Sequence, residues 1–277
     1  MNVDLKRLHN EFGLHKDNNM KYMGSKNRIA KHILPIILKD RKPNQWYVEP
    51  FVGGANMIDK VKGLRLGYDY NELLVACLDA IAKGWEPPKF ISREFYSECR
   101  DKVSSGVYST EEAHILGYVG INGSYGGRWF DGGYAGRSLT KKGTIRDYPL
   151  EAYNNVMKQV NNIKGVEFIS ADYGDIDNID LPPSSIIYCD PPYTGTKEYT
   201  AAKKSGFDTN EFWSWCRERA FDGHSVFISE YNAPDDFVCV WQQEVKSSLS
   251  ATGKCGGSKK SIEKLFTIQQ YQPSKGE

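Results

Sequence analysis

The feature that most constrains this chain is an apolar, β-branched run that stops abruptly at two prolines. Residues 185–189 read Ser-Ile-Ile-Tyr-Cys, and Asp190, Pro191, Pro192 and Tyr193 follow them directly. The run is typical of a buried strand, and the prolines end it because they cannot donate to a sheet ladder. The chain must therefore leave the sheet with a carboxylate, a rigid turn and an aromatic ring at the strand's carboxyl end, where open α/β folds bind ligands.

This arrangement suits the chemistry of an exocyclic amino group on a nucleobase. The lone pair of such a nitrogen is delocalised into the ring, which makes the nitrogen a poor nucleophile. The Asp190 carboxylate and the Pro191 carbonyl can each accept an N–H, which favours a lone pair directed at an electrophile, and Tyr193 can stack on a flipped base. The pattern predicts methylation of an amino nitrogen, with a plain strand-ending turn as the alternative.

Composition limits the classes of protein to which the chain can belong. With 277 residues, of which 40% are hydrophobic, it can form one main domain with a smaller insertion. Lys and Arg total 36 against 35 Asp and Glu, so the net charge of +1 does not decide for or against nucleic acid. The cysteines form no Cys-x-x-Cys pair, which disfavours a zinc site or a disulfide framework. No run approaches the roughly 20 apolar residues of a membrane span, so we expect a cytoplasmic protein.

A glycine turn follows the first predicted strand. Residues 46–51 form that strand, and Gly53 and Gly54 come directly after Val52. Two adjacent glycines let the backbone approach a ligand closely, and Glu49 before the turn can bind an ammonium group. The chain has no Gly-x-Gly-x-x-Gly motif, so a dinucleotide is not the expected ligand.

Two more predicted strands end at acidic side chains. Residues 64–68 precede Asp69, at the place where nucleotide-binding folds hold ribose hydroxyls, although a helix N-cap at Asp69 or Asn71 is the alternative. Residues 166–170 precede an acid and a ring that suit an adenine amino group and its face, Asp172 and Tyr173.

Strands that alternate with helices predict a doubly wound α/β sheet. A helical spacing starts at Ile29, is interrupted by Pro35, and ends near Lys42 and Pro43. The remaining predicted elements are helices over residues 73–81 and 209–220 and strands over residues 225–229, 238–241 and 265–268.

The segment 122–146 combines glycines with aromatic and basic side chains, and only Asp131 opposes its charge. Such a segment has little ability to form a packed core, but it can place guanidinium groups on phosphates or guanine edges and insert rings between bases. A solvated surface charge is the alternative for each basic residue. The side chains expected to contact DNA on this basis are Tyr125, Arg128, Trp129, Arg137, Lys141 and Lys142.

Five motifs in one order carry a family resemblance: residues 21–26, 48–54, 69–71, 172–173 and 190–193. Together they resemble the Dam-like D12 class of adenine-specific DNA methyltransferases, phage-encoded members in particular, over residues 21 to about 270. The resemblance implies an S-adenosylmethionine-dependent enzyme with a mostly parallel seven-stranded sheet and an inserted target-recognition region. It also implies three parts, namely a polar N-terminal segment (1–20), a catalytic domain (21–84 and 166–277) and an inserted, mainly helical DNA-binding domain (85–165).

Site residues follow from the resemblance motif by motif. The catalytic set is Asp190, Pro191, Pro192 and Tyr193, and no metal is expected. Asn122 and Ser124 match an Asn-Gly segment that faces DNA in the family, although the spacing of Gly126 and Gly127 departs from that of the cellular enzymes. The residues assigned to the cofactor are Tyr22, Gly24, Lys26, Glu49, Pro50, Phe51, Gly53, Gly54, Asp69, Asn71, Asp172 and Tyr173.

The expected reaction is methyl transfer to N6 of an adenine flipped from a short duplex DNA sequence. One alternative is an amino methyltransferase of RNA or of protein glutamine, although those families more often have asparagine in place of Asp190. Another is a catalytically silent DNA-binding regulator, which would be free to lose Asp190 or the glycine turn. We expect a monomer in solution, and the sequence leaves open the target site and whether a cognate restriction endonuclease accompanies the enzyme.

Overall fold

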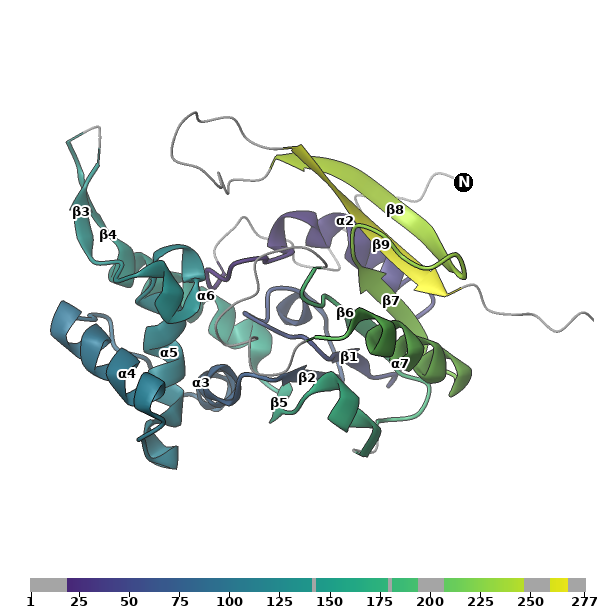
Figure 1. Cartoon of the computed structure of the whole chain (residues 1–277), viewed down its shortest axis with the longest axis horizontal. Helices are drawn as coiled ribbons and strands as arrows, with labels where there is room; N and C mark the ends of the chain where they lie inside the picture. The colour runs from purple at the N-terminus through teal and green to yellow at the C-terminus, as the bar shows by residue number, and fades with distance from the viewer. Residues whose placement is uncertain (1–18, 141–142, 179–180, 194–206, 247–259, 269–277) are drawn as a thin grey trace, which may run out of the picture.

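The computed structural model describes residues 19–140, 143–178, 181–193, 207–246 and 260–268. Its main sheet contains β1 (Tyr47–Glu49), β2 (Arg65–Asp69), β5 (Glu167–Ser170), β6 (Ile186–Cys189), β7 (Ser225–Ser229), β8 (Phe237–Lys246) and β9 (Lys260–Ile268). The seven strands lie in the order β5-β2-β1-β6-β7-β9-β8 (Figure 1). The first five are parallel neighbours, whereas β9 pairs antiparallel with both β7 and β8. The predicted mostly parallel seven-stranded α/β sheet is confirmed.

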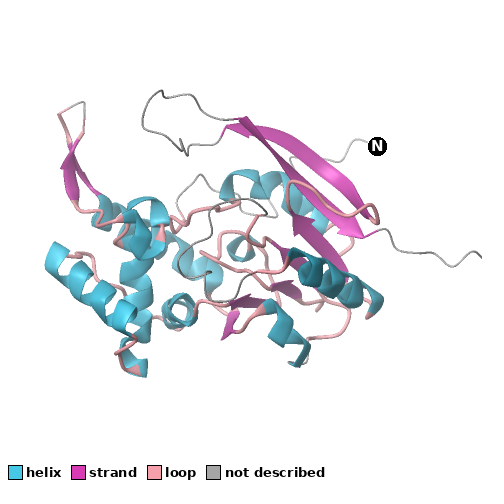
Figure 2. Cartoon of the chain, in the orientation of Figure 1, coloured by secondary structure: helices cyan, strands magenta, loops and turns pink. Residues whose placement is uncertain are grey.

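Helices cover both faces of this sheet (Figure 2). They are α2 (Asn27–Ile37), α3 (Glu72–Ala82), α4 (Arg93–Ser105), α5 (Ala113–Asn122), α6 (Tyr148–Ile163) and α7 (Thr209–Phe221). Strand β6 shows why both faces need a cover. Its side chains alternate, so Ile186 and Tyr188 join the core formed with α2 and α3, while Ile187 and Cys189 join the core that contains Phe212 of α7.

Two of the predicted helix boundaries need correction at α2. We expected Pro35 to interrupt the helix, but α2 continues through Pro35 and ends at Ile37 instead of near Lys42. An interior proline removes one backbone hydrogen bond. The apolar face of α2, which buries Ile33 and Leu34 against the sheet, outweighs that local loss.

The region between α3 and β5 is mainly helical and includes a hairpin between α5 and α6. Helices α4, α5 and α6 lie together beside the sheet, and the hairpin of β3 (Arg137–Leu139) and β4 (Ile145–Asp147) extends away from them (Figure 1). Leu116 and Tyr118 of α5 share one buried cluster with Leu74 and Leu78 of α3. The insertion therefore packs on the sheet domain through a common core, and its division into a separate domain stays a prediction.

None of the helices within the described residues has both the length and the apolar character needed to cross a membrane.

Candidate active site

Three acidic side chains lie at one edge of the sheet. Glu49 ends β1, Asp69 ends β2, and Asp190 follows β6 directly. These strands are parallel, with β1 in the middle, so their carboxyl ends share an edge. Asp172 lies just beyond β5, on the other side of β2. The structure thus brings four of the predicted acids to the carboxyl edge of the sheet.

Asp190 is held in an ion pair with a lysine from the N-terminal motif. The Lys26 ammonium lies 2.9 Å from Asp190 Oδ1 and 4.4 Å from the centroid of the Tyr193 ring. The side chain of Lys26 is only 9% exposed and that of Asp190 is 21% exposed, so solvent screens this pair weakly. Lys26 was assigned to the cofactor on sequence grounds, and the structure places its charged end on the Asp-Pro-Pro-Tyr motif.

The sequence interpretation missed Glu263 as a member of this cluster. Glu263 Oε2 lies 3.8 Å from the Lys26 ammonium and accepts a hydrogen bond of 3.1 Å from the Tyr193 hydroxyl. Tyr231 packs edge-on against Tyr193, with the two ring centroids 4.6 Å apart. Glu263 belongs to β9, a run of mixed polar and apolar residues without a recognisable pattern, so no local motif identified it.

Burial and charge act in opposite directions on the ionisable groups of this cluster. Burial raises the pKa of Asp190 above its usual range, and the attraction of Lys26 offsets only part of that rise. Burial lowers the pKa of Lys26, but Asp190 and Glu263 together outweigh it and the net direction is upward. Lys26 is therefore a cation at neutral pH, and it favours the ionised form of Asp190.

The glycine turn lies directly against Tyr22. A side chain at Gly53, where φ is +48°, would place its Cβ 2.8 Å from Tyr22 Cε1, and one at Gly54 would place it 2.7 Å from Tyr22 Cβ. These separations are shorter than Cβ contacts in proteins allow. The glycines were expected to let a ligand approach the backbone, and the close neighbour that the structure shows is the ring of another predicted cofactor residue.

Replacement of Gly54 by alanine is expected to lower the free energy of unfolding by about 1–3 kcal/mol, because the new methyl group must displace Tyr22. Thermal or urea unfolding of the two proteins measures the difference. Gly174 is a matched control, since a Cβ there would meet only Asp172 Oδ1, at an ordinary 3.6 Å. Equal stability of the Gly54→Ala variant and the native chain would contradict the packing argument.

Asp69 and Asn71 have separate roles in the turn after β2. One oxygen of Asp69 accepts from the Gly53 amide at 2.9 Å and the other from the Asn71 amide at 3.0 Å. Asn71 caps α3, because its side chain accepts from the Leu74 amide at 3.1 Å. Of the two residues considered as a helix N-cap, Asn71 is the one that caps α3. Asp69 ties the end of β2 to the glycine turn and keeps further lone pairs for a ligand.

Glu49 is the most deeply buried of the four acids. It is 2% exposed, and its Oε1 accepts a hydrogen bond of 2.9 Å from the Tyr47 hydroxyl. Burial raises the pKa of Glu49 well above its usual range. Pro50 is buried beside it and directs the chain out of β1 toward Phe51.

Asp172 and Tyr173 differ in how accessible they are. Asp172 is partly exposed, and its Oδ1 accepts from the Gly174 amide at 3.0 Å. Tyr173 is packed among other rings, with its centroid 5.5 Å from that of Phe51 and 5.9 Å from that of Trp215. The predicted single stacking ring is therefore part of an aromatic cluster, in which Phe51 is the more exposed member.

Comparisons with known proteins show the family of the chain. The sequence model of the D12 class N6 adenine-specific DNA methyltransferases matches residues 22–214. The chain belongs to this family. Among solved structures, two of the rRNA methyltransferase aviRa from Streptomyces viridochromogenes have TM-scores of 0.41 and 0.40, with 10% and 9% sequence identity. Each alignment covers 97% of this chain and 93% of the other. A comparison with curated protein sequences gives no match.

Methyltransferases of the D12 class use S-adenosylmethionine, and the carboxyl edge fits such a molecule. Asp69 offers acceptors for hydroxyl groups, and Asp172 together with Phe51 offers an acceptor and a ring for a purine. The buried Asn56 Oδ1, just after the glycine turn, has no hydrogen-bond partner among the described residues and can accept from a ligand. Within those residues no group of His, Cys, Asp and Glu side chains could hold a metal ion.

The residues expected to contact DNA in this D12-class chain divide into three groups. Asn122, Ser124 and Trp129 are between 4% and 9% exposed, so their predicted direct contact with DNA does not agree with the structure. Tyr125, Arg128 and Arg137 are exposed and remain candidates. Lys141 and Lys142 lie outside the described residues.

The three buried side chains stabilise the insertion. Ser124 donates to the Gly120 carbonyl at 2.8 Å and pairs with the Tyr96 hydroxyl at 3.0 Å. Asn122 donates to the Tyr118 carbonyl, and the Trp129 ring packs on Gly120. The expectation that segment 122–146 has little ability to form a packed core is therefore wrong for its first part.

Proposed function

We propose that this D12-class enzyme transfers a methyl group from S-adenosylmethionine to N6 of an adenine that is flipped out of duplex DNA. One observation carries the proposal. The Lys26 ammonium, an N–H donor, lies 2.9 Å from Asp190 Oδ1 and 4.4 Å from the Tyr193 ring centroid. A flipped adenine would need these same two contacts, namely an acceptor for its amino group and a ring against its face.

Asp190 and the Pro191 carbonyl orient the amino group in this scheme. Accepting an N–H at each of two points favours a nitrogen whose lone pair is directed away from both acceptors. When bound, the cofactor supplies an electrophilic methyl group on its sulfonium. Asp190 is then the nearest base to the proton that the methylated nitrogen must lose. The Lys26 ammonium leaves Asp190 when the adenine binds, and Glu263, 3.8 Å from the ammonium, is positioned to pair with the displaced lysine.

The acids at the carboxyl edge bind different parts of the cofactor in this scheme. Asp69, already bonded to the Gly53 amide, takes ribose hydroxyls, and Asp172 takes the amino group of the cofactor's adenine. Because the Asp69 bond links β2 to the glycine turn, binding at the ribose end stabilises the turn against which the methionine part lies.

The hairpin of β3 and β4 supports duplex DNA as the substrate. Leu139 and Ile145 are paired across it and are 72% and 74% exposed, so they form an apolar pair on the surface of the hairpin. Arg137 lies on the same hairpin with a side chain that is 68% exposed. Apolar side chains between basic groups can enter a base step while the cations contact phosphates.

Substitution of both Leu139 and Ile145 by serine is expected to reduce DNA methylation by about tenfold or more. Two bases that are unstacked would then no longer have apolar side chains to contact between them. Affinity for S-adenosylmethionine should stay unchanged, since the hairpin is remote from the carboxyl edge (Figure 1). Val107, which is 72% exposed after α4, provides the control substitution Val107→Ser. Equal loss of methylation in the control would argue against a specific role of the hairpin.

Transfer of labelled methyl groups to unmethylated duplex DNA, followed by nucleoside analysis, tests the proposed function. N6-methyladenine at a short recurring sequence is the expected product. Parallel reactions with RNA and with glutamine-containing protein test the two other acceptors. Label in either of those, without labelled DNA, would replace the proposal, and cofactor binding without any labelled acceptor would indicate a silent DNA-binding protein.

A further inference from the structure

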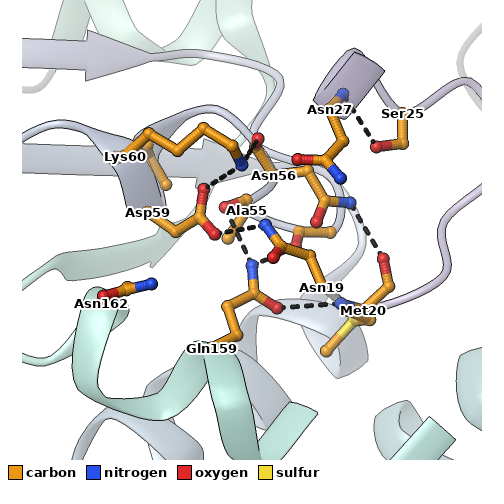
Figure 3. Close-up of polar contacts among 12 residues, drawn as sticks. Asn19, Met20, Ser25, Asn27, Ala55, Asn56, Asp59, Lys60, Gln159 and Asn162 are labelled. Atoms are coloured by element: carbon orange, nitrogen blue, oxygen red, sulfur yellow. Dashed lines mark hydrogen bonds and ion pairs between the residues drawn. The ribbon is translucent and has the colours of Figure 1, made fainter. Parts of the chain in front are cut away.

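A glutamine of the insertion bridges two segments of the proposed cofactor site. Gln159 lies in α6 and is 2% exposed. Its Nε2 donates to the Gly54 carbonyl at 3.1 Å and to the Ala55 carbonyl at 3.0 Å (Figure 3). Its Oε1 accepts from the Met20 amide at 3.1 Å. One side chain therefore contacts both the glycine turn and the segment that leads into the N-terminal motif.

Met20 is fixed from both sides. Its amide donates to Gln159, and its carbonyl accepts from Asn56 Nδ2 at 3.0 Å (Figure 3). Asn56 follows the glycine turn directly, so the turn and the Met20 backbone bind each other through two amide side chains. Tyr22, two residues after Met20, is the ring that packs on Gly53 and Gly54.

The turn needs external support because its conformation is strained. Ala55 has φ of +55°, in the left-handed region that residues with a Cβ rarely adopt. Its amide bonds to the Val52 carbonyl at 2.9 Å, and its carbonyl bonds to Gln159. Strained backbone persists where its surroundings hold it in place. The side chain that holds Ala55 from outside the turn comes from α6.

We propose that Gln159 is a positioning residue through which the DNA-recognition insertion sets the shape of the cofactor-binding turn. The inference rests on the proposed function, because it takes the glycine turn to be where the cofactor lies. Binding of the cofactor selects the turn conformation that Gln159 stabilises, and loss of Gln159 weakens binding without touching the reacting groups. Asp190 and Lys26 are contacted by neither end of the Gln159 side chain.

Only glutamine chemistry satisfies this bridge. The site requires one acceptor for the Met20 amide and two N–H donors for two carbonyls, which is what a single carboxamide offers. Glutamate has the same shape, but it would place an oxygen, which cannot donate, against the carbonyls of Gly54 and Ala55 and near the buried Asp59. Methionine has a similar length and offers neither strong donors nor an acceptor. The two substitutions therefore remove the bridge in different ways.

The test measures cofactor affinity of the full-length chain by calorimetry with S-adenosylmethionine, without DNA. We expect Gln159→Met to weaken binding by about tenfold and Gln159→Glu by at least as much, since each lost hydrogen bond in a buried site weakens binding several-fold. In steady-state methylation, KM for the cofactor should rise while kcat changes by less than about threefold.

A purely structural role makes a different prediction, and Val156→Ala provides the matched control. Val156 lies one turn before Gln159 on the same helix, is 1% exposed, and has an apolar side chain that packs in the core and cannot bind the carbonyls of the turn. Its truncation should lower the unfolding temperature and leave cofactor affinity unchanged. If the Gln159 variants also lose thermal stability but keep native affinity, the proposal is wrong.

Two further outcomes are distinguishable. If Gln159→Met does not fold, Gln159→Asn withdraws the amide from the turn by one methylene and is measured in the same way. Native affinity in that variant would overturn the proposal. If the unsubstituted chain itself does not bind S-adenosylmethionine, the proposed function fails, and the role of Gln159 fails with it for that separate reason.

Discussion

Replacement of Asp190 by alanine is expected to reduce methyl transfer by about 10³-fold or more, the largest effect of any single substitution in this chain. The carboxylate is the charged acceptor for the amino group, and the Pro191 carbonyl alone cannot orient two N–H bonds. Affinity for S-adenosylmethionine should change by less than about threefold, because Asp190 acts on the acceptor nitrogen. Single-turnover transfer of labelled methyl groups to DNA, together with calorimetry, separates these two quantities.

Two controls accompany this substitution. Asp190→Asn keeps the volume and one acceptor oxygen but removes the charge, so we expect it to retain more activity than Asp190→Ala. Asp175 is an exposed acid in the turn after Asp172, and its replacement by alanine should leave transfer unchanged. Full turnover by Asp190→Ala would mean that another group orients the amino nitrogen. A loss of cofactor affinity as large as the loss of transfer would place Asp190 in the cofactor site instead.

The sequence predicted the strand-end acids because local chemistry determines them. An apolar strand that stops at a proline leaves its last polar residue at the sheet edge, and Glu49 and Asp190 follow this rule, while Asp69 ends β2 just before the cap of α3. The parallel order of the strands then brings these acids together. No contact between distant segments had to be known in advance.

Glu263 and Gln159 could not be predicted in the same way. Each lies on an element that carries no motif pointing to it, namely a strand of mixed polar and apolar residues and a helix with one apolar face. Their roles arise only when β9 pairs with β7 and when α6 packs beside the glycine turn. Long-range packing of this kind leaves no local spacing in the sequence.

Trp129 was misassigned for a related physical reason. Aromatic side chains near arginines are consistent with DNA contact, but they also form small cores. Gly120 of α5 has no side chain, and the Trp129 ring fills the space above it. The exposed apolar pair that supports DNA contact, Leu139 and Ile145, lies farther along the same segment and was not singled out from the sequence.

Removal of the Lys26 charge is expected to shift the pH dependence of the enzyme upward. Asp190 must be ionised to accept the amino group, and burial already raises its pKa. Lys26 opposes that rise, so Lys26→Met should raise the pKa of Asp190 further, because the nearby positive charge that favours the ionised carboxylate is lost. The acidic limb of kcat/KM for DNA, which reports the free enzyme, should move to higher pH by the same amount. At pH values below the pKa of Asp190, kcat/KM falls about tenfold per pH unit.

Glu263 provides a test of opposite sign. Its negative charge raises the pKa of Asp190, so Glu263→Gln should lower that pKa and move the acidic limb to lower pH. Lys26→Arg keeps the cation and should leave the limb near its native position. If the limb stays in place in both Lys26→Met and Glu263→Gln, then Asp190 is not the group whose ionisation limits the reaction. Displacements in opposite directions would instead show that the Lys26 and Glu263 charges together set the ionisation of the carboxylate that binds the target nitrogen.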